Sequence, residues 1–484
     1  MFRALQKTWP QDKDFPERQY RISMLTRVLR GEIYDNLRYS FDEEKNGANE
    51  YIKLRERRPS VRYGLCKLVV DDSVALLFSE GHFPKLDCGD DEKTRSALQR
   101  IIKETTLNEV MIDAATRGSV GSVCILFRVL SSRIFLDVME TTYLTPTWNP
   151  ETPDTLMKVT ERYKVKGHGL VAAGYAISAD DLNKPFWFQR EWDNAAETWF
   201  LPLAVDDPKQ KIPSVDQQKT VKHQLGFVPM AWVKNLPGGD EIDGSCTFPN
   251  EAIDTGIEID YQLSQAGRGL KYSSDPTLLI KEPSFSDGTM VRSASNAITV
   301  DKDGDAKLLE INGTAVEAVI NYVRVLRELA VENMHGNRAN ADKISAAQSG
   351  RAMELMNQGL IWLADRLRIS YGEGALLSLL NMIIIASNKM SLVYKDGSSV
   401  GKLEQKTAIV LRWPAWYQPT ASDLQATATT LHLLVDSGIL SRETAVKTIA
   451  AQYDIEDVEA ELALIKAEMA EREANAKKQI TINE

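Results

Sequence analysis

One segment of the sequence contains the residue types of a phosphate-binding loop. It runs from Gly397 through Gly401 and Lys402 to Leu403. A loop of this kind needs four residues between its glycines and a Ser or Thr after the lysine, because that hydroxyl binds Mg²⁺. Here three residues separate the glycines, and Leu403 follows the lysine. We therefore interpret the segment as a hairpin turn and predict no cofactor.

A second segment has the alternating carboxylates of a calcium loop. Asp301, Asp303 and Asp305 alternate as calcium ligands do, and such a loop also needs Gly at position six and Glu at position twelve. Gly304 is instead at position four and Asn312 at position twelve. We interpret the segment as a solvated turn between two strands, with Asp303 and Gly304 at the turn.

The histidines and cysteines do not form a metal-binding pattern. Two pairs share a helix face, Glu332 with His335 and His432 with Asp436, but each pair supplies only two ligands and is interpreted as a surface pair. The cysteines are widely spaced without a Cys-x-x-Cys pair, so we expect reduced thiols, no metal site and no disulfide. These cysteines are Cys66, Cys88, Cys124 and Cys246.

The charge balance argues against a protein that binds nucleic acid over a broad face. The 484 residues include 58 Lys and Arg against 68 Asp and Glu, a net charge of −10, which has the wrong sign for phosphate binding. One dense basic cluster, formed by Arg55, Arg57, Arg58 and Arg62, is interpreted as a solvated helix face rather than a nucleic-acid patch.

The common sequence marks of acyl transfer and dinucleotide chemistry are missing from the chain. There is no Gly-x-Ser-x-Gly elbow and no Gly-x-Gly-x-x-Gly turn. A site assembled in space from distant residues stays an alternative.

The longest apolar stretch, Ala375 to Ala386, is shorter than the roughly 18 residues of a membrane span, and we expect a buried helix there. The first residues lack the apolar run of a signal peptide.

The elements that must position any site begin with a helical region over residues 1 to about 110, including a helix at Leu65 to Phe78. Residues 120 to 233 hold short runs of β-branched and aromatic residues and predict a β-rich region. Its tryptophans are expected to pack in the core or across strands; they are Trp187, Trp192, Trp199 and Trp232. Turn formers then predict a domain boundary near residue 240.

Two helices with a β segment between them follow. Asn250 is a plausible N-cap for a helix over 250–266, which Gly267 and Gly269 should end. Residues 270–313 predict a small β insertion, and a second helix should begin at Thr314 and end near Gly336.

The C-terminal third is predicted to be mostly helical. A short polar loop, His335 to Lys343, should precede a long helix from about Ile344 to Lys389, and a strand pair is expected at about 392–413. Three helices should end the chain; Gly438 ends the first, and Ser441 and Asp454 cap the others.

Four stretches in chain order resemble the portal proteins of tailed bacteriophages, of the siphophage type. They are Leu68 to Phe78; Ala114 to Ile125 with Gly118; Leu225 to Pro229 followed by Asn235, Asp243 and Gly244; and Leu434 to Thr444, a "Gly-x-x-Ser-x-Glu-Thr" pair of helices that includes Gly438 and Ser441, with Asp454 to Glu459 after it. The resemblance covers nearly the whole chain. It implies an α+β portal fold assembled as a ring and a non-enzymatic protein.

The resemblance also implies a division of the chain. Its parts would be a wing over 1–249, a first stem helix over 250–266, a clip over 267–313, a second stem helix over 314–334, a tunnel loop over 335–343, a long helix with returning wing strands over 344–419, and a helical crown over 420–484.

By the same resemblance, the protein would form the channel at one capsid vertex through which DNA is packaged and ejected. The expected partners are further copies of the chain, as a dodecamer, double-stranded DNA, the terminase large subunit, major capsid and scaffold proteins, and head-completion adaptors; no membrane is expected. The chain would belong to the virion and be assembled in the host cytoplasm. The tunnel-loop residues that would face DNA are Asn337, Arg338, Asn340 and Lys343.

Two other classes of protein remain as alternatives. One is a soluble cytosolic enzyme whose carboxylate or histidine cluster assembles in space from the β-rich region. The other is a different structural protein of the virion, such as a scaffold or adaptor.

Overall fold

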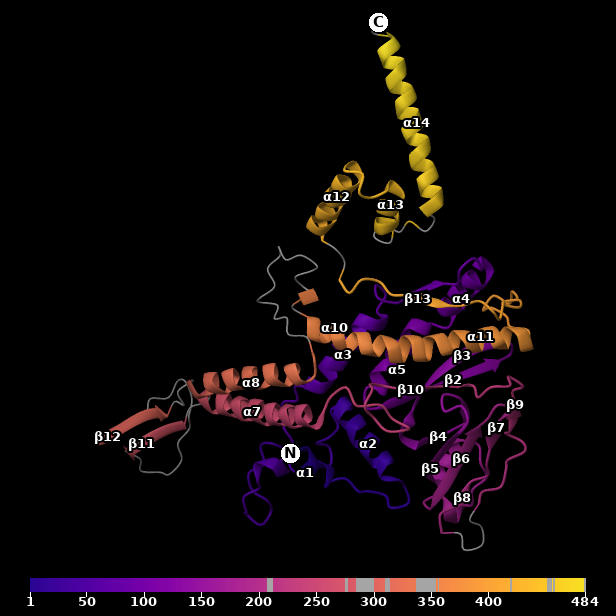
Figure 1. Ribbon diagram of the computed structural model, residues 1–484. Helices are drawn as coiled ribbons and strands as arrows, with labels where there is room; N and C mark the ends of the chain where they lie inside the picture. Colours follow the sequence, from indigo (N-terminus) through magenta and orange to yellow (C-terminus); the bar gives the residue numbers. More distant parts are fainter. Residues whose placement is uncertain are drawn as a thin grey trace. The chain divides into compact units, whose positions relative to one another are not determined.

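The computed structural model describes residues 1–206, 212–274, 277–283, 300–309, 314–336, 354–355, 357–417, 420–450, 455 and 458–482. The chain forms two compact units (Figure 1). One comprises Met1–Ala339 and Asn357–Trp416, and the other comprises Asn340–Met356 and Tyr417–Glu484. Helices and strands are mixed within the first unit, which confirms the predicted α+β class.

The N-terminal region is helical, as predicted. Helix α3 begins and ends at the predicted residues, Leu65 and Phe78, because its apolar side chains recur on the faces that pack into the core. A single-turn helix, η1 (Leu54–Glu56), also lies here, and two others, η2 (Thr141–Tyr143) and η3 (Ala179–Asp181), lie in the β-rich region that follows. The remaining helices of this region are α1 (Phe2–Gln6), α2 (Glu17–Arg30), α4 (Glu92–Glu104) and α5 (Leu107–Gly118).

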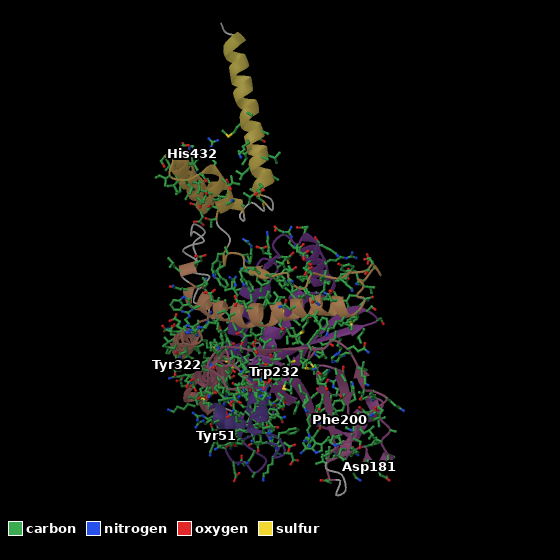
Figure 2. The ribbon with its side chains drawn as sticks, turned by 45° about the vertical axis from the view of Figure 1, so that its right-hand side comes forward. Tyr51, Asp181, Phe200, Trp232, Tyr322 and His432 are labelled. Carbon is green, nitrogen blue, oxygen red and sulfur yellow. The ribbon has the colours of Figure 1, made fainter. Side chains whose placement is uncertain are left out.

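A three-stranded antiparallel sheet follows, with the order β10-β2-β3. Its strands are β2 (Ser122–Leu130), β3 (Arg133–Glu140) and β10 (Met230–Lys234). Ser131 and Ser132 connect β2 to β3, and both have positive φ angles, as a tight two-residue hairpin turn requires. Trp232 on β10 donates its indole N–H to the carbonyl of Ile242 (Figure 2).

A six-stranded antiparallel sheet completes the β-rich region. Its order is β4-β5-β6-β7-β9, with β8 paired to β6. The prediction for the tryptophans is confirmed: Trp192 is fully buried, and Trp199 packs edge-on against Phe188. Helix α6 (Gly167–Ala172) follows β5. The strands are β4 (Leu144–Trp148), β5 (Leu156–Lys166), β6 (Pro185–Trp192), β7 (Ala196–Trp199), β8 (Leu203–Ala204) and β9 (Val221–Lys222).

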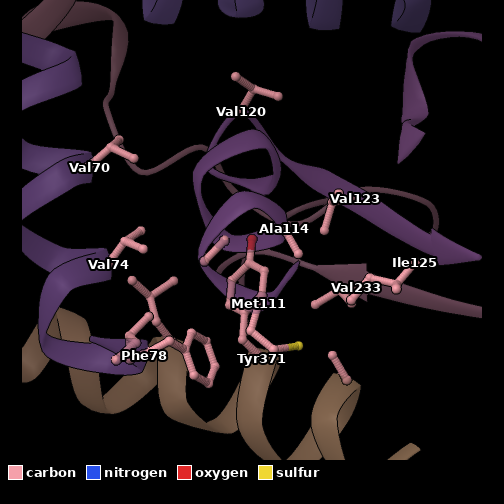
Figure 3. Close-up of a cluster of buried hydrophobic side chains, with 14 of the residues drawn as sticks. Val70, Val74, Phe78, Met111, Ala114, Val120, Val123, Ile125, Val233 and Tyr371 are labelled. Carbon is pink, nitrogen blue, oxygen red and sulfur yellow. The ribbon is translucent and has the colours of Figure 1, made fainter. Parts of the chain in front are cut away.

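A long helix crosses the first unit and contributes much of its core. It consists of α10 (Gln358–Leu367), a π-helical segment η5 (Arg368–Leu376) and α11 (Leu377–Lys389). By length and composition alone, Gln358–Lys389 could cross a membrane. However, half of its most apolar window is buried in the protein, and Tyr371 meets side chains of α3, α5, β2 and β10 in one hydrophobic cluster (Figure 3). The expectation of a buried helix is therefore confirmed.

The region after the β-rich part differs from the prediction at one helix end. Helix α7 spans Asn250–Ser274, so Gly267 and Gly269 do not end it. A glycine inside a helix costs only about 1 kcal/mol. Arg268 and Lys271 form ion pairs with Glu44 and Asp42, and these tertiary contacts lie along the extra turns.

Helix α8 (Thr314–Asn333) begins at the predicted residue. Between α7 and α8, strands β11 (Thr277–Pro283) and β12 (Val300–Leu309) pair antiparallel. The predicted turn at Asp303 and Gly304 is wrong, because both residues belong to β12, where the register against β11 shifts. Residues 301, 303 and 305 therefore belong to an irregular strand, not to a turn.

The predicted strand pair at 392–413 is also corrected. Strand β13 (Val410–Arg412) pairs with β1 (Lys85–Asp87), which is distant in the sequence. Strand pairing depends on closeness in space and not on closeness in the sequence. Only a single bridge joins Val393 to Ser399. The turn between them has Gly397 at a φ of 84°, which confirms a turn in place of a phosphate-binding loop.

The second unit contains α12 (Ala421–Asp436), α13 (Arg442–Ala450) and α14 (Val458–Ile482), the three helices that the sequence predicts. Gly438, at a φ of 70°, follows α12, and the Ser441 hydroxyl accepts a hydrogen bond from the Thr444 N–H at the start of α13. The predicted cap at Asp454 lies outside the described residues.

Candidate functional site

The residues predicted to face DNA, Asn337, Arg338, Asn340 and Lys343, all lie outside the described residues. The structure does describe the two ends of that part of the chain. A Cβ atom at Gly359, near the start of α10, would lie 3.7 Å from the Cα atom of His335. The chain therefore leaves α8 and returns to α10 at nearly the same place.

Helix α7 is fixed to the body by a buried carboxylate. Asp260 accepts hydrogen bonds of 2.7 Å from the Tyr34 hydroxyl and of 2.7 Å from the Tyr63 backbone N–H. Burial raises the pKa of Asp260, although both hydrogen bonds act in the opposite direction. The neighbouring Tyr261 donates its hydroxyl to the Arg57 carbonyl at 2.9 Å. One face of α7 is thus locked to the N-terminal region.

The solvated interpretation of the basic cluster holds for Arg55, Arg58 and Arg62, which are exposed, but is wrong for Arg57, which is buried. Arg57 is only 1% exposed and donates two hydrogen bonds to the Ile52 carbonyl, at 2.7 and 3.1 Å. Arg62 donates to the Gly31 carbonyl and pairs with Asp35 at 3.1 Å. Because a buried guanidinium needs acceptors, Arg57 organises the loop that supports α7. The helical part of this segment is only the single turn η1.

Helix α8 packs against α7 and carries an apolar stripe on its outer side. Tyr322, Val325 and Leu329 are 47%, 52% and 53% exposed, and their three- and four-residue spacing places them on one face. Tyr322 is labelled at this surface in Figure 2. We call these three residues the α8 stripe. Only the bounds of this helix were predicted from the sequence, although the three- and four-residue spacing of the stripe was present there.

A buried junction of polar residues joins helix α2 to the start of the three-stranded sheet. The Asp243 carboxylate is 1% exposed and accepts two hydrogen bonds from Arg18, at 2.7 and 2.8 Å. The Ser122 hydroxyl donates to it at 2.6 Å, and Arg21 pairs with it at 3.0 Å. Arg18 also donates to two backbone carbonyls, those of Thr141 and Leu144. A buried charge is tolerated where its partners are this complete.

The junction continues through Asn235 to the long helix. Asn235 donates to the Thr247 hydroxyl and to the Ser245 carbonyl, both at 2.9 Å, and accepts a hydrogen bond of 3.1 Å from the Tyr371 hydroxyl. A Cβ atom at Gly118 would lie 2.1 Å from that hydroxyl oxygen. Gly118, Asn235 and Asp243 are residues of the second and third resembling stretches, and the fold brings them together.

The titratable groups of the described residues do not assemble into a metal centre. Within those residues, no group of three or more His, Cys, Asp and Glu is placed to hold a metal ion. His432 and Asp436 lie 3.4 Å apart on an exposed helix face, which confirms the predicted surface pair. All four cysteines are free, and burial raises the pKa of Cys66 and of Cys246 to about 12.

The first unit is thus an α+β body with a helical pair whose outer stripe has no covering partner among the described residues. A family model described as "Phage portal protein, SPP1 Gp6-like" matches residues 187–475, more than half of the chain. The chain therefore belongs to this family of phage portal proteins. The family is structural and non-enzymatic, and its members are portal components of the phage particle.

A chain in the structure of the neck of an empty GTA particle, computed with C6 symmetry, is also similar. The match has a TM-score of 0.38 and 11% sequence identity, and covers 80% of this chain and 88% of that chain. A comparison with curated proteins gives no match.

Proposed function

We propose that the chain assembles into a ring, a dodecamer, whose central channel admits double-stranded DNA at one capsid vertex. Membership of the portal family supports a connector role. The net charge of the chain is −10. Each contact between a basic side chain and a phosphate strengthens DNA binding, so a channel lined mainly by acidic residues would bind the duplex weakly. A weakly bound duplex can slide through the channel.

The observation that carries the ring proposal is the α8 stripe. About half of each side chain in the stripe is exposed, and apolar surface on an isolated helix face gains free energy when a second protein covers it. A neighbouring copy of the chain is the partner that a closed ring supplies.

The ring proposal is tested with the full-length protein by light scattering and negative-stain images of the same fractions. Wild type should give a large ring with a central hole. The double variant V325D/L329D should remain a small species, because carboxylates replace the apolar contact. The matched control is I320D, since Ile320 is 42% exposed and is not part of the α8 stripe. Rings formed by V325D/L329D as readily as by wild type would exclude the stripe as the interface.

We further propose a division of labour along the chain. Residues 1–249 form the wing, 250–266 of α7 and 314–334 the stem, the segment 267–313 with strands β11 and β12 the clip, 344–419 the long helix and returning wing strands, and 420–484 the crown. The order of these elements supports this division, since the two helices of the stem enclose one β hairpin in sequence. The clip is then the docking site for the terminase large subunit and, later, for head-completion adaptors.

The loop 335–343 is proposed as the tunnel loop, with Asn337, Arg338, Asn340 and Lys343 facing DNA. The two ends of this part of the chain, near His335 and Gly359, lie close together. A shorter connection can therefore still join α8 to α10 without a change in the fold. Deletion of 337–343 should leave ring size unchanged in negative stain and reduce DNA packaged in an assembly assay. Normal packaging by intact rings would contradict the assignment.

The proposal includes the remaining partners. Major capsid and scaffold proteins would surround the ring during assembly in the host cytoplasm.

A further inference from the structure

A cleft of about 910 Å³ lies in the β-rich region, between the two sheets. One wall is aromatic and comes from β5, β6 and β7, with Tyr163, Phe188, Trp192 and Trp199. The opposite wall is the second half of β2, from Leu126 to Leu130, and the segment that leads into β10. This volume is in the range of sites that bind an organic ligand or a few side chains.

The cleft follows the edge of strand β2. Side chains of a strand alternate between its two faces, yet all five consecutive residues from Leu126 to Leu130 line the cleft. A space that touches both faces in this way must run along the strand edge. The covering strand β10 pairs with β2 only from Ser122 to Leu126, so the last part of β2 has no paired strand on that side among the described residues.

The backbone of β2 offers hydrogen bonds at this edge. The Phe127 N–H donates to the Pro229 carbonyl at 2.8 Å, so the peptide groups of Phe127 point toward β10. Because the direction alternates along a strand, those of Val129 point the same way. Among the described residues, the Val129 N–H has no acceptor on that side. An extended segment could pair there.

Buried donors and an excess of positive charge mark the same cleft. The indole N–H of Trp192 and the Nε–H of Arg128 are buried and have no acceptor among the described residues. The lining also includes Arg190, Lys219 and Lys222. Glu197 is the carboxylate among the residues that line it.

Arg190 is partly neutralised within the cleft. It donates a hydrogen bond of 2.6 Å to Glu161 and lies 3.5 Å from Glu197, and its guanidinium stacks on Trp192 and Trp199 at 4.6 and 4.7 Å from the ring centroids. Arg128 is 3.6 Å from Asp137. The two lysines leave the mouth of the cleft positive, although the chain as a whole is acidic.

We propose that this cleft binds an extended segment of another polypeptide that adds to the free edge of β2 as a strand. The segment would alternate acidic and apolar side chains. Its backbone pairs with Val129, its apolar side chains pack on the aromatic wall, and its carboxylates meet Arg128 and Lys222. Strand addition of this kind takes affinity from main-chain hydrogen bonds and specificity from alternate side chains. The proposal goes beyond the portal function and does not depend on ring formation.

The test uses the full-length protein and a fluorescein-labelled nine-residue peptide that alternates Glu with Val and Phe. Binding is measured by fluorescence anisotropy. A peptide with Lys in place of Glu should bind at least about tenfold more weakly, which corresponds to about 1.4 kcal/mol. A peptide with alternate backbone amides methylated on the pairing edge should bind about three- to tenfold more weakly, because it cannot complete the ladder.

Variants of the protein locate the peptide. V129P removes only the outward N–H, since proline is tolerated at a strand edge, and should weaken binding about three- to tenfold; V129A keeps that N–H and should bind as wild type. K222E should weaken the acidic peptide and strengthen the lysine peptide, whereas K406E, a change at an exposed lysine outside the cleft, should do neither. If V129P does not fold, the methylated peptide provides the same measurement. Equal binding of the acidic, basic and methylated peptides, or no binding at about 1 mM, would overturn the proposal.

Discussion

The buried junction around Asp243 and the α8 stripe belong to the same compact unit but are completed in different ways. At the junction, the Asp243 carboxylate, Arg18 and Asn235 find their partners within the chain. Along the stripe, Tyr322, Val325 and Leu329 leave about half of their surfaces exposed. Folding of the chain therefore satisfies the polar groups of the junction. The apolar side chains of the α8 stripe would be buried further only by association with another protein.

The largest effect on stability is expected at Asp243. The change D243A leaves the half-buried Arg18 without its bidentate partner and removes the acceptor of the Ser122 hydroxyl. The free energy of unfolding should fall by about 3–5 kcal/mol, as when one partner of a buried ion pair is lost. Denaturant unfolding measures it. The control D180A, at an exposed position, should change it by less than about 0.5 kcal/mol.

A second test addresses the packing between Gly118 and Tyr371. The change G118A should cost about 1–3 kcal/mol, as overpacking does, because the new Cβ would lie 2.1 Å from the Tyr371 hydroxyl oxygen. In a Y371F background the same change should cost less, since that oxygen is gone. G81A is the matched control, because nothing lies within 4 Å of a Cβ there. Equal costs in both backgrounds would refute the steric explanation.

A smaller effect should come from Asp240 at the rim of the junction. Burial alone would raise its pKa, but backbone N–H groups of Asp243 and Ile242 and the Arg21 guanidinium outweigh burial and lower it from 3.8 to about 2. A lowered pKa stabilises the fold above the unfolded value, and this stabilisation is lost as the pH falls from about 4 through 2.

The side chain of Asp240 is 47% exposed, so solvent screening limits its contribution to about 1 kcal/mol or less. The variant D240N should therefore lose less stability than wild type between pH 5 and pH 2. Unfolding by urea at the two pH values measures the difference. Parallel losses in the two proteins would show that Asp240 does not contribute.

The smallest effect on folding is expected at the stripe. The variant V325D/L329D should change the free energy of unfolding of the dissociated chain by less than about 0.5 kcal/mol, because both side chains are already half exposed. Circular dichroism during urea unfolding, at a concentration where wild type is dissociated, measures it. A loss comparable with that of D243A would remove the contrast between the two regions.

Local sequence patterns predicted the elements whose boundaries depend on near neighbours. The bounds of α3, the start of α8 and the turn at Gly397 follow from apolar spacing, capping and backbone freedom. Local patterns did not predict the end of α7, since its last turns form ion pairs with Glu44 and Asp42, which are distant in the sequence. They also did not predict the partner of β13, since β1 is equally distant.

The candidate site divides in the same way. Gly118, Asn235 and Asp243 stood out by their order in the resembling stretches, but nothing in the sequence said that Tyr371 and Arg18 would meet them. The solvated interpretation of Arg57 was wrong because its acceptor, the Ile52 carbonyl, becomes available only when the loop folds.

The sequence by itself determined the α+β class and the order of the elements, because these depend on residue type and local spacing. The portal family came from the resemblance of four stretches, taken in chain order, to that family. The tertiary structure decided which side of α8 stays uncovered, which charges are buried in pairs, and where the edge of β2 opens into a cleft. Exposure and pairing are properties of packed surfaces, and they arise only when residues distant in the chain come together.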